Sequence, residues 1–260
     1  MKLFWFIALT VSYITILANE TITNTQENDG FGSQFQNIIA TVIFAELNNK
    51  NYVYTPFKKM EHNYDSDPLF IQKKEWLINF ITNFKVNTNN TGKKQCGCKA
   101  FLDKNIIKGS QCLSLKKIKQ VFRANKENPY INNKNLNIAL HMRRPNNHDN
   151  RIMGADTPDD FFLKIINKLR GLYQSKKPLF HIYSQGNVNN FAKFNAPDIS
   201  LHLNDTVEDA FIPMVFADIL VIGRSSFSYT AGLLSEGIVY YIPFWHSPLP
   251  HWIDANKLVL

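Results

Sequence analysis

Short apolar segments alternate with amphipathic segments throughout the second half of the chain. The apolar segments have the length and β-branched content of buried strands, and the segments between them repeat apolar residues at helical spacing. Strands and helices that alternate through short loops imply right-handed crossovers and one parallel sheet. We therefore predict an α/β, Rossmann-like domain in this half. Its expected strands cover residues 138–140, 179–183, 199–203, 219–222 and 238–242.

The expected helices of this half begin with residues that suit helix N-termini. Residues 157–160, Thr-Pro-Asp-Asp, combine an N-cap residue, a first-turn proline and two acids. Asn204 or Asp205 is expected to cap the next helix, which runs to Phe216. Residues 223–228 lead into a third helix that ends near residue 237.

The first half of the chain has a weaker pattern. Residues 19–29 are polar and are predicted to form a linker. A Gly-rich turn at residues 30–33 then opens a helix whose apolar residues recur at helical spacing up to Leu47. The remaining predicted elements are a strand at 52–55, helices at 75–84 and 113–126, and a loop at 87–110.

Polar residues follow the predicted strands of the second half. Because parallel strands end on one edge of a sheet, where ligands bind in α/β folds, we expect these residues to converge on a site. They are Arg143-Arg144, Ser184-Gln185-Gly186, Asn204-Asp205, Arg224-Ser225-Ser226 and Pro243-Phe244-Trp245-His246.

Two of these strand ends have the chemistry of a phosphate site. Arg143 and Arg144 end a buried strand, where a guanidinium needs a partner in place of water, and phosphate is such a partner. Ordinary surface salt bridges are the alternative. Ser225 and Ser226 stand at a helix start, where free amides hold phosphate, although simple capping would need only one of them. Phe227 either stacks on a base or belongs to the core.

The charge of the chain adds little to this hypothesis. The net charge is +8 over 260 residues, which fits an anionic partner. The densest basic cluster, Lys116, Lys117 and Lys119, lies on an expected helix and is best interpreted as a solvated face. A nucleic-acid binder would need a basic face with interleaved aromatics, which the sequence does not contain, so no nucleic-acid partner is expected.

The N-terminal residues resemble a targeting segment. One lysine precedes an apolar run at residues 3–18, which ends in the small residue Ala18. This pattern is typical of a secretory signal peptide, with an uncleaved signal anchor as the alternative and the only expected membrane contact. We therefore expect secretion or residence in the Golgi or endoplasmic reticulum lumen. Sequons for glycosylation begin at Asn19, Asn89 and Asn204.

The cysteines and one acidic motif were considered as further sites. Cys96, Cys98 and Cys112 fit one disulfide, Cys112 with either of the others, and we interpret them as structural. They lack a fourth zinc ligand at suitable spacing. Asp65 and Asp67 form an Asp-x-Asp pattern that binds metal in some enzymes, but the pattern also suits a simple turn cap, so we predict no metal site.

Three motifs resemble those of the GDP-fucosyltransferase superfamily, which contains inverting α1,2-, α1,6- and protein O-fucosyltransferases. Residues 141–144, His-Met-Arg-Arg, are similar to the His-x-Arg-Arg signature at the end of a C-domain strand. Residues 224–228, Arg-Ser-Ser-Phe-Ser, resemble a later Ser-rich segment, and residues 30–34 resemble a Gly-rich turn in the N-domain. The order and spacing of the three agree with the family and span most of the chain after residue 29.

The resemblance implies a GT-B fold with two Rossmann-like domains. On this basis an acceptor domain is expected at residues 30–130 and a nucleotide-sugar domain at 131–260. The implied donor is a GDP-sugar, such as GDP-fucose, and the implied acceptor is a glycan or protein hydroxyl. No cofactor is implied. The donor-binding residues implied by the motifs, or expected beside them, are Gly30, Gly32, His141, Arg143, Arg144, Arg224, Ser225, Ser226 and Phe227.

The implied reaction is an inverting, metal-independent transfer. A base deprotonates the acceptor hydroxyl, which attacks the anomeric carbon as GDP departs. By resemblance Arg143 contacts the diphosphate and Arg144 orients the following loop. The base is Asp149, His148 or Glu61, and the sequence does not choose among them. The family often has Gly-Asp after the Arg pair, where this chain has Pro-Asn, so a catalytically inactive, secreted nucleotide- or glycan-binding protein is the alternative.

Overall fold

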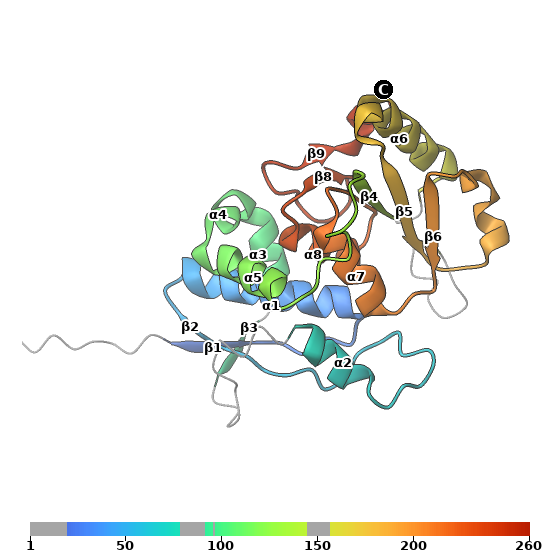
Figure 1. Cartoon of the computed structure of the whole chain (residues 1–260). Helices are drawn as coiled ribbons and strands as arrows, with labels where there is room; N and C mark the ends of the chain where they lie inside the picture. Colours follow the sequence, from blue (N-terminus) through green and yellow to red (C-terminus); the bar gives the residue numbers. More distant parts are fainter. Residues whose placement is uncertain (1–19, 79–91, 96, 145–156) are drawn as a thin grey trace, which may run out of the picture.

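A computed structural model describes residues 20–78, 92–95, 97–144 and 157–260 of the chain. It contains two β-sheets, shown in Figure 1, with the strand orders β6-β5-β4-β7-β8-β9 and β2-β1-β3. Every strand pair in both sheets is parallel. The predicted fold class, α/β with parallel Rossmann-like sheets, is confirmed. The division into domains at residues 130 and 131 stays a prediction.

The larger sheet has the strand order of a dinucleotide-binding domain. From β4 the chain adds β5 and β6 on one side of the sheet and then returns to add β7, β8 and β9 on the other side. The boundary between β4 and β7, where the direction of strand addition reverses, is the switch point of the sheet. Ligands bind beside such a switch point, at the carboxyl ends of the strands. The strands are β4 (Asn137–His141), β5 (Leu179–Ser184), β6 (Ile199–Leu203), β7 (Ile219–Ile222), β8 (Ile238–Tyr241) and β9 (Ile253–Asp254).

Both faces of the central strands β4 and β7 are buried, which explains their continuous apolar runs. Ile138 and Leu140 of β4 pack in one core with helix α6, whereas Ala139 between them belongs to the other core. The helices that follow the strands are α6 (Asp159–Leu172), α7 (Val207–Phe216) and α8 (Ser226–Leu234), with short 3₁₀ segments η2 (Gln174–Lys176), η3 (Val188–Phe194) and η4 (Ala255–Leu258).

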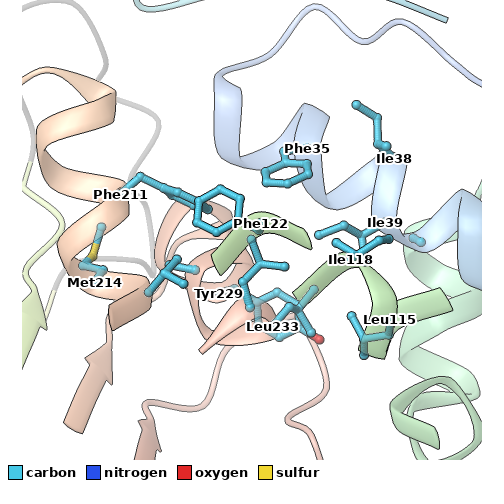
Figure 2. Packing of buried hydrophobic residues seen from close by; sticks show 14 of the residues in the cluster. Phe35, Ile38, Ile39, Leu115, Ile118, Phe122, Phe211, Met214, Tyr229 and Leu233 are labelled. Carbon is cyan, nitrogen blue, oxygen red and sulfur yellow. The ribbon is translucent and has the colours of Figure 1, made fainter. Parts of the chain in front are cut away.

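The first half of the chain is organised around helix α1 (Phe31–Leu47). Figure 1 shows α1 between the smaller sheet and α5. Helix α1 also contacts α8, which follows strand β7 of the larger sheet. In Figure 2, Phe35 of α1 lies in one cluster with Phe122 of α5 and Tyr229 of α8. The other elements of this half are β1 (Thr21–Asn24), β2 (Asn51–Val53), α2 (Phe70–Leu77), β3 (Lys93–Gln95), α3 (Cys98–Lys104), α4 (Ile106–Gln111) and α5 (Leu113–Ala124).

The predicted linker at residues 19–29 is wrong, because β1 is the central strand of the smaller sheet. Its polar side chains are buried but hydrogen-bonded. The Oγ1 atoms of Thr23 and Thr55 lie 2.6 Å apart, and Asn24 Nδ2 donates to the Thr55 carbonyl at 2.9 Å. Paired in this way, buried polar groups lose little on leaving water, so a strand of low hydrophobicity is stable here.

The predicted loop at 87–110 is also wrong over its described part, which contains β3, α3 and α4. Cys98 and Cys112 are not joined to each other. Cys98 Sγ lies 3.9 Å from the Gln95 carbonyl and Cys112 Sγ lies 3.6 Å from the Lys108 carbonyl. Cys96 lies outside the described residues.

Two predicted caps differ from the structure. Helix α6 begins one residue later than expected, with Pro158 rather than Thr157 at the N-cap position. Helix α7 is capped by Thr206, whose Oγ1 accepts from the Asp209 amide at 3.2 Å, and not by Asn204 or Asp205. Over the described residues, no helix combines the length and the hydrophobicity that a membrane crossing requires.

Candidate functional site

A cavity of about 340 Å³ lies at the carboxyl ends of β4 to β7, beside the switch point. This volume is within the usual range for small-molecule sites. Its wall on the larger sheet comes from the strand ends that the sequence predicts to converge. The first half of the chain supplies the opposite wall, which consists of Asp29, Gly30, Phe31, Gly32, Ser33, Glu61, His62, Tyr64 and Phe70.

The two predicted arginines have different surroundings. Both line the cavity. Arg144 also donates to the Thr157 carbonyl at 2.7 Å and forms an ion pair with Asp159 in the first turn of α6. The Arg144 side chain therefore ties the strand end to the start of α6.

His141 is a neutral residue of the cavity wall. Burial, helped by the Arg143 guanidinium, lowers the pKa of His141 to about 3. Its Nδ1 lies 2.9 Å from Ser228 Oγ, which holds the ring against the first turn of α8. At neutral pH the imidazole adds no positive charge to the cavity, so any contact with an anion is an ordinary hydrogen bond.

The N-terminus of α8 faces the cavity through Ser225, Ser226 and Phe227. Ser225 is the N-cap, since its Oγ accepts from the Phe227 amide at 3.3 Å. Ser226 is not needed for capping, and it is among the residues that line the cavity. An uncompensated helix N-terminus attracts anions through its free amides and its dipole.

Phe227 packs in the core and also lines the cavity, and its stacking on a base stays a prediction. Its ring packs on Phe31 and Phe211, at centroid distances of 6.4 and 5.4 Å, and on His141 at 5.6 Å. It also lines the cavity. The ring is therefore part of the core and at the same time part of the cavity wall.

Gly32, predicted to contact the donor, has a packing role. A Cβ at this position would lie 2.3 Å from the Phe227 Cα and 2.5 Å from its backbone nitrogen. Thr230 Oγ1 also donates to the Gly32 carbonyl at 3.0 Å. The glycine thus permits the first turns of α1 and α8 to touch, and both turns border the cavity.

The other predicted site residues fall into three groups. Gly30 lines the cavity as the N-cap of α1. Arg224 follows β7 but is not among the residues that line the cavity. Asp149 and His148 lie outside the described residues, so their catalytic role stays a prediction. Glu61, the third candidate base, lines the cavity.

Carboxylates gather at the α1 side of the cavity. Asp29 Oδ1 accepts from the Gly30 amide at 2.7 Å, and the Asn28 side chain donates to Glu61 at 3.1 Å. Asp29, Glu61 and His62 each bring a ligand atom within 4.8 Å of the others, a donor set that suits a cation.

The Asp-x-Asp motif, by contrast, contains a turn cap. Asp67 accepts from the Leu69 amide at 2.8 Å and pairs with Lys73 at 2.7 Å. These contacts lower the pKa of Asp67, the hydrogen bond from Lys73 most. The carboxylate is therefore engaged locally at the start of α2.

Several residues of the cavity escape sequence reasoning. Asp29 was assigned to a linker, and its position just before the Gly-rich turn was the available signal. Tyr183 and His202, from β5 and β6, stack at a centroid distance of 4.6 Å and line the cavity beside Asp205. Their positions within strands β5 and β6 give no sign of a site.

No protein-family model matches the chain, and the comparison with curated proteins finds no match. Solved structures with a related arrangement include the fucosyltransferase NodZ from Bradyrhizobium, with a TM-score of 0.46 and 10% identity over 88% of this chain and 99% of that chain. POFUT1 in complex with GDP has a TM-score of 0.47 and 11% identity over 87% and 99% of the two chains. The E. coli heptosyltransferase WaaC with ADP has a TM-score of 0.41 and 9% identity over 92% and 95%.

Proposed function

We propose that the chain is an inverting, metal-independent glycosyltransferase that transfers fucose from GDP-fucose to a glycan or protein hydroxyl in the secretory pathway. One observation carries the proposal. The Arg143 side chain and the N-terminus of α8 border one cavity at the switch point of a Rossmann-like sheet. The donor and acceptor identities follow the motif resemblance at residues 141–144 and 224–228.

The diphosphate fits the α8 side of this cavity. A guanidinium gives two parallel, charge-assisted hydrogen bonds to a phosphate. The first turn of α8 adds amide donors and the Ser226 hydroxyl. Negative charge at the α1 side, from Asp29 and Glu61, disfavours a phosphate there and fixes the polarity of the bound nucleotide.

The nucleoside fits the part of the cavity formed by β5 and β6. Strands β7 and β6 are three strand spacings apart, about 14 Å, so a nucleotide with its phosphates at α8 reaches β6. There the Asp205 carboxylate can accept from the adjacent N1–H and N2–H₂ groups of guanine, a donor pair that adenine, uracil and cytosine lack. This feature supports a guanine nucleotide.

The proposed reaction breaks the bond between the anomeric carbon and the β-phosphate oxygen of the donor. The transition state has oxocarbenium character, and negative charge grows on the departing phosphate. A fixed cation at that oxygen speeds the step, which is the role of Arg143. A carboxylate on the α1 side takes the acceptor proton, and of the predicted bases Glu61 is the one within the described cavity.

The proposal predicts that Arg143→Ala weakens GDP binding by roughly ten- to a hundredfold with the fold intact, because charged hydrogen bonds are worth roughly 1.5–3 kcal/mol. Arg143→Lys should recover little, since an ammonium does not make the bidentate contact. Calorimetric titration with GDP measures the effect. Arg170→Ala is the matched control, because Arg170 pairs with Asp198 at 2.7 Å and is not among the lining residues.

Four outcomes would contradict the proposal. GDP binding by Arg143→Ala like that of the parent would remove its central residue. Stabilisation by UDP, ADP or CMP equal to that by GDP in a thermal-shift panel would remove the guanine preference. Loss of transfer with chelator and its recovery with Mn²⁺ would instead assign the cluster of Asp29, Glu61 and His62 to a metal. GDP binding without turnover of any GDP-sugar would favour the inactive binding protein.

A further inference from the structure

Three side chains from distant parts of the chain form a hydrogen-bonded relay that ends at the cavity. Asp103 of α3 approaches His246, which follows β8, with 3.0 Å between Oδ2 and Nδ1. The His246 Nε2 lies 3.4 Å from Ser226 Oγ at the start of α8. Ser226 lines the cavity, whereas His246 is only 8% exposed and lies behind it.

The relay is held from several sides. Asp103 Oδ1 accepts from the Ser247 amide at 3.0 Å, which fixes the carboxylate. Tyr241 of β8 donates to the His246 carbonyl, and the Tyr229 ring of α8 lies 5.0 Å from the imidazole. Burial raises the pKa of both tyrosines, so both stay neutral. Among the described residues in these contacts, Asp103 is therefore the charged group that faces the imidazole.

The hydrogen bonds fix where the protons lie. A carboxylate only accepts, so Nδ1 of His246 carries a proton and donates to Asp103. In the neutral imidazole Nε2 is then an acceptor, and the Ser226 hydroxyl donates to it. With its proton engaged at Nε2, the Ser226 hydroxyl has only oxygen lone pairs to offer to a ligand in the cavity that this residue lines.

This arrangement conflicts with an anionic ligand. A phosphate oxygen is an acceptor, and the Ser226 hydroxyl has one proton for two acceptors. The conflict ends when a proton binds Nε2, because Nε2–H then donates to Ser226 Oγ and the hydroxyl proton turns to the phosphate. The added charge on His246 is balanced by the adjacent Asp103 carboxylate, whose Oδ2 lies 3.0 Å from Nδ1.

We propose that Asp103 and His246 are positioning residues that allow the Ser226 hydroxyl to donate a hydrogen bond to a phosphate. A nucleoside diphosphate then binds together with one proton. This inference rests on the proposed GDP site. It adds two residues, Asp103 and His246, that do not line the cavity and that determine whether GDP binding takes up a proton.

Calorimetry in buffers of different ionisation enthalpy tests the proposal. Near pH 8 the terminal phosphate of GDP, with a pKa of about 6, is fully ionised and brings no proton of its own. The parent protein is expected to take up about one proton with each GDP, and its affinity is expected to fall by about tenfold for each further pH unit. If the hydroxyl simply rotates from Nε2 to the phosphate, no proton is taken up and the proposal fails.

Asp103→Asn separates this role from a structural one. The new amide keeps an oxygen for the Ser247 amide and gives Nδ1 a donor. The neutral imidazole then carries its proton on Nε2, as Ser226 requires. We expect this variant to take up no proton and to bind GDP more tightly than the parent near pH 8. Proton uptake equal to that of the parent would overturn the proposal.

Two further variants complete the test. His246→Gln offers a carbonyl to Ser226 and an amide to Asp103, so it should bind GDP weakly and without proton uptake. Ser226→Ala should lose about tenfold in affinity together with the uptake, because a charge-assisted hydrogen bond is removed. GDP binding without uptake by the parent refutes the relay and leaves the proposed function standing. Failure of the parent to bind either GDP or inorganic pyrophosphate refutes both.

Discussion

Replacing Gly32 by alanine separates a packing role from a ligand-binding role at the Gly-rich turn. The added Cβ would lie 2.3 Å from the Phe227 Cα, a backbone atom that no rotamer change can move. The first turns of α1 and α8 therefore have to separate by about 1 Å to restore ordinary contact at 3.4 Å. Insertions of this size into a packed interior cost about 1–3 kcal/mol.

Urea and thermal unfolding measure this cost. In a chain of this size, 1 kcal/mol corresponds to roughly 2–4 °C in Tm, so Gly32→Ala should lower Tm by about 2–12 °C. Gly171→Ala is the matched control, because a Cβ at Gly171 in α6 meets no atom within 4 Å. Replacing this helical glycine should raise the free energy of unfolding by up to about 1 kcal/mol.

The result that refutes the packing argument is a Gly32→Ala protein as stable as the parent. If that protein also fails to bind GDP, the glycine is present for close approach of the phosphates, as the sequence motif suggests. If it is destabilised while Gly171→Ala is not, the contact between α1 and α8 is the reason for the glycine.

Two further predictions concern buried charge. Lys74 of α2 is 2% exposed and pairs with Glu208 of α7 at 2.8 Å, so Glu208→Gln should cost roughly 3–5 kcal/mol in urea unfolding by leaving a buried ammonium unpaired. Lys74→Met should cost less, and equal losses would contradict this explanation. The lowered pKa of His141 means that the unfolded chain gains a proton near pH 6.5 whereas the folded chain does so only near pH 3. The free energy of unfolding should therefore fall by about 2 kcal/mol from pH 7 to pH 5. This loss should be absent in His141→Asn, and an equal loss in that variant would assign the pH dependence to other groups.

The central strands of the larger sheet were predictable because they are buried on both faces. Continuous apolar runs bounded by polar turns leave few alternatives, and β7 has the predicted bounds. Strand β6, in which apolar residues alternate with polar ones, also has the predicted bounds. Strand β9 has two residues, too few for any pattern. Arg143, two residues after β4, and Ser226, four residues after β7, were predictable as cavity residues from the expected convergence of the strand ends.

The rest of the site depends on tertiary contacts that no local pattern encodes. His246 meets Asp103 across 143 positions of sequence. In β1, the polarity of Thr23 and Asn24 favoured a linker. Both residues can nevertheless be buried, because Thr55 forms hydrogen bonds with their side chains. The sequence contains both halves of each pair but not the geometry that joins them.

The first turn of α8 links stability to ligand binding. Ser225 caps the helix, Ser226 borders the cavity, and the backbone of Phe227 contacts Gly32. A ligand that binds only the folded state adds about 2.7 kcal/mol of stability at a hundredfold excess over Kd. The destabilisation expected for Gly32→Ala is about 1–3 kcal/mol, which is of similar size. GDP should therefore at least partly restore the Tm of this variant if the cavity survives the separation of α1 from α8. Arg143 follows β4 and belongs to neither α1 nor α8. For Arg143→Ala, the GDP concentration that is a hundredfold excess over the parent's Kd should stabilise the protein less, because the Kd of the variant is higher.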